Sequence, residues 1–226
     1  MTIQIGIYDF FAYTIPGGLY LSVLIYALVT FRVIAPNTVY HIWQDLTITH
    51  IVIFAALAYV TGLIFDPVQR RLWGRWFRFD ESVKIAFDEV RHRYPTLEPR
   101  FEASQWYMLF TRIKFANSKI ALDIERFNAT SKMLRNISFA LLLFALVQVV
   151  YLLQGYAWVL IVMVVFVALS VVVSQQAVRF SKWFYLSTFE TIISMNLPAG
   201  SKLVMMRRTS SEIREGKGSL AESNAE

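Results

Sequence analysis

The sequence contains no cysteine among its 226 residues. This absence excludes disulfide bonds, thiolate metal ligands and a cysteine nucleophile, and it leaves the redox compartment open. Charged residues are also scarce, at 17% of the chain, whereas soluble proteins carry about 25%. The few charges are unevenly divided, because 22 lysines and arginines stand against 16 aspartates and glutamates, for a net charge of +6. Few charges with a basic excess are typical of an integral membrane protein.

Sequence motifs of common enzymes are missing as well. There is no H-E-x-x-H, no G-x-S-x-G and no dinucleotide-binding fingerprint, and the stretch GKGS at 216–219 lacks the earlier glycine of a phosphate-binding loop. His41, Asp45 and His50 lie close together in the sequence, but we interpret them as polar residues at a membrane surface rather than as metal ligands. We therefore expect no enzymatic activity, no cofactor and no metal site.

Long apolar runs are abundant, since 56% of the residues are hydrophobic. Four runs, at 15–35, 46–65, 137–153 and 157–173, contain no aspartate, glutamate or lysine. A helix needs about 20 such residues to cross a bilayer, and four buried helices of this kind are hard to fit into a small soluble protein. The sequence therefore predicts an all-α integral membrane protein with four transmembrane helices arranged as two hairpins.

Arginine and lysine near the ends of these runs predict the orientation. The connections 36–45 and 154–156 contain neither residue, whereas basic residues gather in the insert 66–136 and after the fourth run. Cytoplasmic loops carry such an excess. We expect a multi-pass protein of the inner (plasma) membrane whose insert and two termini lie in the cytoplasm.

The stretch RRLWGRWFRF at 70–79 interleaves arginines with aromatic residues. This pattern occurs in proteins that bind single-stranded nucleic acid and in segments at a membrane surface. Its position directly after the second run, and the lack of an RNA-binding motif, favour anionic lipid headgroups over nucleic acid. The predicted lipid-interface residues are Arg70, Arg71, Trp73, Arg75, Trp76 and Arg78.

The cytoplasmic insert is predicted to be helical. Residues 80–94 read as a short amphipathic helix. Residues 98–136 read as one helix that runs into the third span, since this stretch contains no glycine and no proline after Pro99. This second helix is apolar on two sides, so it needs cover on two sides, either from its own chain or from a subunit or protein partner. One stripe comprises Trp106, Ile113, Ile120, Phe127 and Leu134, and the other includes Met108 and Phe115.

Two features of the spans are polar or flexible rather than apolar. Gln148 lies near the middle of the third span and needs a partner, either as an interhelical contact or in a narrow polar path. Pro16, Gly17 and Gly18 begin the first span, where the glycines permit a close backbone approach or a bend, and a gate hinge is the alternative.

The chain thus divides into five parts: 1–65, with an interfacial segment and two spans; the insert 66–136; two further spans in 137–174; a helical extension over 175–208; and a polar tail, 209–226, expected to be disordered. This layout resembles small multi-span bacterial proteins, some of which are membrane effectors in antiphage systems, but the resemblance is architectural and implies no residue roles. We expect a self-associating component that forms or gates a pore, with a cytoplasmic assembly stalk. The alternative is an anchor that recruits a cytoplasmic protein.

Overall fold

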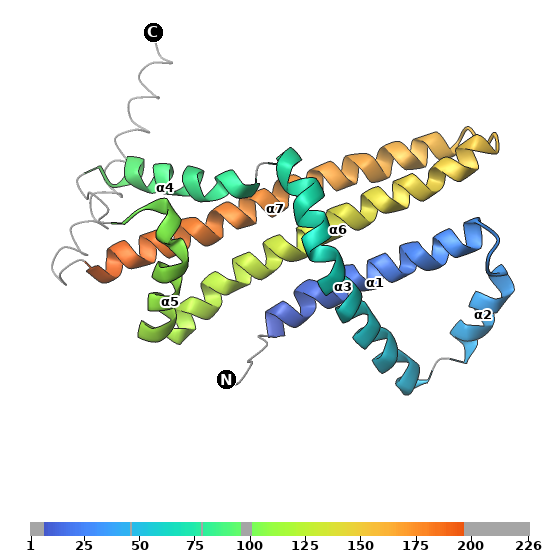
Figure 1. Ribbon diagram of the computed structural model, residues 1–226, viewed down its shortest axis with the longest axis horizontal. Coiled ribbons are helices and arrows are strands. Elements are labelled where there is room, and N and C mark those ends of the chain that lie inside the picture. The colour runs from blue at the N-terminus through green and yellow to red at the C-terminus, as the bar shows by residue number, and fades with distance from the viewer. Residues whose placement is uncertain (1–6, 46, 78, 96–100, 197–226) are drawn as a thin grey trace, which may run out of the picture.

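The computed structural model describes residues 7–45, 47–77, 79–95 and 101–196, and the regular structure within these ranges is helical, without a strand (Figure 1). The predicted all-α class is confirmed. The predicted tail 209–226, and the extension beyond Asn196, lie outside the described residues. The α-helices are α1 (Ile7–Thr30), α2 (Pro36–Gln44), α3 (Ile48–Phe77), α4 (Ser82–Arg93), α5 (Trp106–Ala116), α6 (Ser118–Leu153) and α7 (Val159–Asn196), with short 3-10 helices at Phe79–Glu81 and Ala103–Gln105.

Four of these helices are long and apolar enough to cross a membrane, so the protein is a multi-pass membrane protein, as predicted. The spans lie in α1, α3, α6 and α7. The last two helices are longer than a span requires. With 36 and 38 residues, they extend over roughly 54 and 57 Å at about 1.5 Å per residue. A hydrocarbon layer is only about 30 Å thick, so both helices continue well beyond it.

The long pair α6 and α7 forms the centre of the molecule, and α1, α3, α4 and α5 pack on its two halves (Figure 1). A short turn after Leu153 joins the two helices, which contact each other along their length. On one half, α1 packs beside α6 and α3 crosses over α1; on the other half, α4 lies along α7 and α5 packs against both long helices. The result is a membrane half and an insert half that share α6 and α7.

The crossing of α1 and α3 depends on two glycines. Helix α1 continues through Pro16 without a break, and Gly17 approaches α3 so closely that a Cβ atom there would lie 1.7 Å from the Ala58 carbonyl oxygen. A Cβ atom at Gly62 would lie 2.1 Å from the Tyr13 carbonyl oxygen. Small residues at a crossing let two membrane helices bring their backbones into contact.

The insert half has a hydrophobic core of its own, rich in aromatic rings. Phe189 of α7 is fully buried, with the ring of Phe101 stacked at 5.7 Å and that of Phe87 in edge contact at 5.6 Å. Ile113 of α5 is also fully buried, next to Phe184 and Ile192 of α7. Aromatic side chains bury about 150–250 Å² each, so this cluster supplies much of the packing that holds α4 and α5 on α7.

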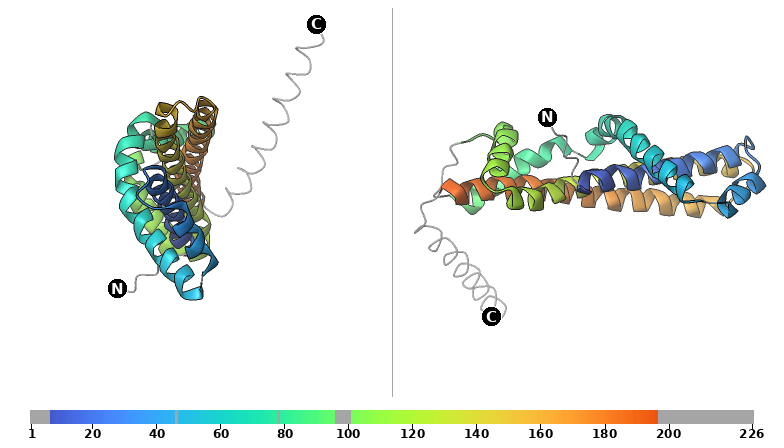
Figure 2. Two further views of the ribbon diagram at one scale, coloured as in Figure 1. Left: turned by 90° about the vertical axis from the view of Figure 1, so that its right-hand side faces the viewer. Right: turned by 90° about the horizontal axis from the view of Figure 1, so that it is seen from below.

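The prediction of one unbroken helix over 98–136 is wrong. Asn117 adopts an extended conformation between α5 and α6, and its side-chain oxygen accepts hydrogen bonds from the backbone N–H groups of Lys119 and Ile120, both at 3.2 Å. Asparagine is a favoured N-cap, so it ends one helix and starts the next without any glycine or proline. As a consequence, α5 runs across α6 and α7 instead of extending α6 (Figures 1 and 2).

Candidate functional site

A buried ion pair joins two membrane helices at the level where α3 leaves the membrane half. The Arg135 guanidinium on α6 lies 2.8 Å from the Asp66 carboxylate on α3, and their side chains are only 8% and 19% exposed. Both residues sit at the end of an apolar run that faces the basic insert. The pair keeps this junction electrically neutral where water is largely excluded.

Neighbouring polar groups add further hydrogen bonds around Asp66. The Asn136 side-chain amide donates to the same Asp66 oxygen at 3.1 Å and to the Lys132 carbonyl at 3.1 Å. The Tyr20 hydroxyl of α1 in turn donates to the Asn136 carbonyl at 2.9 Å. One connected set of hydrogen bonds therefore holds α1, α3 and α6 together at this depth.

The same cluster reaches the beginning of the insert. The Phe79 ring, in the short 3-10 helix before α4, lies 5.6 Å from the Arg135 guanidinium carbon in a cation–π arrangement. Gln69 follows Asp66 by one turn of α3, is fully buried, and has no hydrogen-bond partner among the described residues. The cluster therefore connects α3 and α6 to the first residues of the insert.

Two further polar layers lie between the spans. Ser138 of α6 and Ser170 of α7 exchange hydrogen bonds, since each hydroxyl donates to the other residue's carbonyl, at 2.9 and 2.8 Å. Further along α6, Gln148 is buried beside Tyr26 of α1. The structure therefore places Gln148 in a contact between two helices of one protomer.

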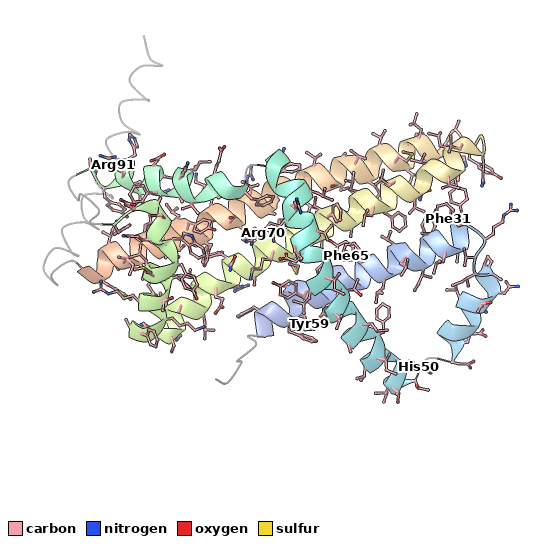
Figure 3. The ribbon with its side chains drawn as sticks, viewed as in Figure 1. Phe31, His50, Tyr59, Phe65, Arg70 and Arg91 are labelled. Carbon is pink, nitrogen blue, oxygen red and sulfur yellow. The ribbon has the colours of Figure 1, made fainter. Side chains whose placement is uncertain are left out.

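The predicted lipid-interface residues lie in or directly after the last turns of α3. Arg70, labelled in Figure 3, is exposed there, and so is Arg71. Trp73, Arg75 and Trp76 belong to α3 but their side chains lie outside the described residues, as does Arg78. The described part thus presents two arginines to the surroundings close to the Asp66–Arg135 pair.

The two predicted stripes of the insert have different environments. In the first, Ile113 is buried and Trp106, Phe127 and Leu134 are partly buried, while Ile120 is exposed. Trp106 contacts the rings of Phe184 and Tyr185, and Phe127 contacts those of Phe180 and Trp183, all on α7. In the second stripe, Met108 and Phe115 are exposed. The first stripe therefore packs largely inside the chain and the second faces outward.

A network of charged residues fixes α4 to α7. Glu89 pairs with Lys182 and with Arg93, and the Arg93 guanidinium also reaches Glu190 at 2.9 Å. The hydrogen bond from Lys182 holds the pKa of the Glu89 carboxyl below its ordinary value, although partial burial opposes this shift. Salt bridges at a partly exposed surface are individually weak, so the network orients α4 on a contact formed mainly by apolar packing.

The central cluster was not predicted from the sequence. Arg135 belongs to the basic residues of the insert 66–136 that predict the orientation, whereas Asp66, Asn136 and Tyr20 had no predicted role. The sequence does contain a signal for an ion pair. Asp66 follows the second span and Arg135 precedes the third, so the two charges lie on the same predicted side of the membrane. In the described part of the chain, no group of three or more histidine, aspartate or glutamate residues is arranged to hold a metal ion.

Comparisons of the chain with protein-family models, with curated proteins and with solved structures find no match.

Proposed function

We propose that this chain is a non-enzymatic, self-associating protein of the inner (plasma) membrane that forms or gates a pore under the control of its cytoplasmic helical insert. The observation that carries this proposal is the continuity of α6 and α7. Each helix passes without a break from the apolar membrane half into the hydrophobic core of the insert. A rigid shift of the insert would therefore reach the spans directly, as in other switching transitions.

The polar layers support a pore between protomers rather than through one. Ser138 and Ser170 are buried and hydrogen-bonded to each other within a single chain, and Gln148 is buried between α6 and α1. These side chains stabilise contacts between helices and are not available to line a water-filled path. A conducting path would then form where several copies meet, which makes self-association a requirement of the proposal.

The proposed orientation places the insert and both termini in the cytoplasm, with the spans as two hairpins. The basic residues close to the span ends support it, since Arg70, Arg71, Arg179 and Lys182 lie on segments that leave the membrane half toward the insert. The turn between α6 and α7 at the opposite end carries no lysine or arginine. Anionic headgroups of the cytoplasmic leaflet are the proposed partners of Arg70 and Arg71.

The exposed face of α5 favours a second candidate function, an anchor that holds a different cytoplasmic protein at the membrane. Phe115 is the informative residue, because it is exposed whereas Trp106 packs inside the chain. In a pull-down from solubilised membranes, a stoichiometric partner that is lost on Phe115→Asp would support the anchor. Retention of the same partner by this variant would count against it.

The mass of the detergent-solubilised particle, corrected for bound detergent, is the decisive first measurement for the pore. We expect several copies per particle, followed by ion conductance or dye leakage from reconstituted vesicles. A monomeric particle that leaves vesicles tight would overturn the proposal.

A further inference from the structure

The second membrane span begins with a cap that contains a histidine. Helix α3 starts at Ile48, and the Thr47 carbonyl accepts its first helical hydrogen bond, from the Ile51 N–H group at 3.2 Å. Thr47 is therefore the N-cap residue and His50, labelled in Figure 3, is the third residue of the helix. The His50 ring turns back onto Thr47, with Nδ1 at 3.2 Å from the Thr47 backbone nitrogen and 2.8 Å from its hydroxyl oxygen.

This arrangement is a capping box in which histidine replaces the usual glutamate or glutamine. A backbone N–H group can only donate, so the bond from Thr47 requires that the Nδ1 atom of His50 is unprotonated and accepts. A neutral imidazole with its proton on Nε2 meets this requirement. An imidazolium does not, because both of its ring nitrogens carry hydrogen. The cap therefore exists only while His50 is neutral.

The charge of a protonated His50 is also unfavourable at this position. The N-terminal end of a helix carries a partial positive charge, which repels a cation placed on its first turn. The first turn of α3 contains no acidic residue that could offset this repulsion. Protonation of His50 therefore removes the cap and adds a repulsive charge at the same place.

Little packing holds this turn once the cap is lost. Ile48, Ile51 and Val52 are 81%, 58% and 62% exposed, and the closest approach of α3 to α1 lies further along, at Ala58 and Gly62. The first backbone N–H groups of a helix have no partner within the helix, so they depend on a cap or on water. Loss of the cap is therefore expected to fray the start of α3 while the crossing with α1 stays in place.

The other titratable groups around this end of α3 are of types that keep their charge state near neutral pH. Asp45 precedes the cap, and Tyr40 lies on α2, which leads to it. On α1, Tyr13 and Tyr20 contact rings further along α3, and the buried ion pair lies beyond them. Aspartate and tyrosine do not ordinarily titrate between about pH 5 and 8, whereas histidine does. A response in this range therefore points to a histidine.

We propose that His50 is a proton-sensitive cap, which holds the first turn of α3 when neutral and releases it in acid. The stabilisation is complete at a pH where the imidazole is neutral and is lost as the pH falls and the ring takes up a proton. In the orientation proposed above, this turn lies on the outer side of the membrane, so acid outside the cell regulates the start of the second span. The sidedness rests on that proposed orientation, whereas the cap itself does not.

The lack of native cysteine allows a test with a single nitroxide spin label in the full-length chain. The label is attached at Ile51→Cys, an exposed position in the capped segment, and its mobility is measured in lipid vesicles at about pH 8 and about pH 5. We expect several-fold faster motion in acid. His50→Gln retains an acceptor at both pH values, so the label should stay slow in both, whereas His50→Ala should leave it fast in both.

Three further variants are matched controls. His41→Gln on α2, His92→Gln on α4 and Asp45→Asn should each respond to acid as the native chain does. The proposed cap is overturned if the label does not respond to pH in the native background, or if His50→Gln responds as strongly.

A last comparison separates the cap from the proposed orientation and pore. In intact cells, the label should respond to acid added outside. A response only after the cytoplasm is acidified would overturn the sensing of outside acid together with the orientation, and it would leave the cap intact. A label that responds in a protein that never conducts would count against the pore alone.

Discussion

Arg135 and Asp66 stand 69 positions apart in the sequence and form a 2.8 Å ion pair between α6 and α3. The pair is the point at which two membrane helices and the first residues of the insert meet, because Phe79 packs on the same guanidinium. A disturbance of this pair is therefore expected to affect both halves of the protein.

Removal of one partner should be costly. Asp66→Leu leaves a buried guanidinium without its counter-charge, and such changes cost about 3–5 kcal/mol. The double variant Asp66→Leu with Arg135→Leu should recover most of that loss, because apolar replacement of a whole buried pair is often neutral. Thermal unfolding in detergent measures the effect, with Arg71→Leu on the exposed surface as the control. Equal losses in the single and double variants would show that the charge is not the cause.

The crossing of α1 and α3 gives a second prediction. Gly17→Ala places a methyl group 1.7 Å from the Ala58 carbonyl oxygen, so the helices must separate, whereas Gly18→Ala meets no atom closer than 3.8 Å. Overpacking of this kind costs about 1–3 kcal/mol or more. We expect a clear drop in melting temperature for Gly17→Ala and almost none for Gly18→Ala. A similar response of the two variants would contradict the close crossing.

The contact of α4 with α7 should weaken in acid. Lys182 and Arg93 lower the pKa of Glu89 in the folded protein. Its contribution is therefore complete above the unfolded value of about 4.3 and is lost as the pH falls through the lower folded value. The effect is small, about 1 kcal/mol at most, because the side chains are partly exposed. Proteolysis of the insert as a function of pH should show a smaller acid effect in Glu89→Gln than in the native chain, while Asp88→Asn should behave like the native chain.

The proposed orientation can be tested by labelling single cysteines. Gln154→Cys, in the turn between α6 and α7, should react with a membrane-impermeant maleimide in intact cells. Lys84→Cys should react only after the membrane is permeabilised. The reverse pattern would place the insert outside the cell and invalidate the proposed sidedness.

The spans were predictable from the sequence because each apolar run carries its own signal of length and composition. The break at Asn117 was not, since the seven-residue spacing from Ile113 to Ile120 continues across it and an asparagine cap is not a strong breaker. The spacing did separate the two stripes, because Ile113 and Phe115 lie on nearly opposite sides of α5. Which side is covered was not predictable, since it is the packing of α5 on α7 that buries Ile113 and leaves Phe115 exposed.

The central cluster could not be predicted from any short stretch of the sequence, because its residues lie far apart along the chain. Asp66 and Arg135 each look like an ordinary charge at a span end, and only the packing of α3 on α6 makes them partners. Likewise, Gly17 alone permits either a bend or a close approach. Its role as a crossing point follows from the positions of Ala58 and Gly62 on the neighbouring helix.

The separation of Asp66 and Arg135 along the chain has a consequence for biosynthesis. A ribosome adds about 5–20 residues per second, so the 69 residues from position 67 to Arg135 take roughly 3–14 s to synthesise. During this interval α1 and α3 can already enter the membrane and cross at Gly17, while Asp66 and the Tyr20 hydroxyl lack the partners that α6 will supply. In the nascent chain, the Asp66 carboxylate must stay hydrated, or be shielded by the insertion machinery, until the third span is inserted. The order of synthesis is therefore part of how the protein folds.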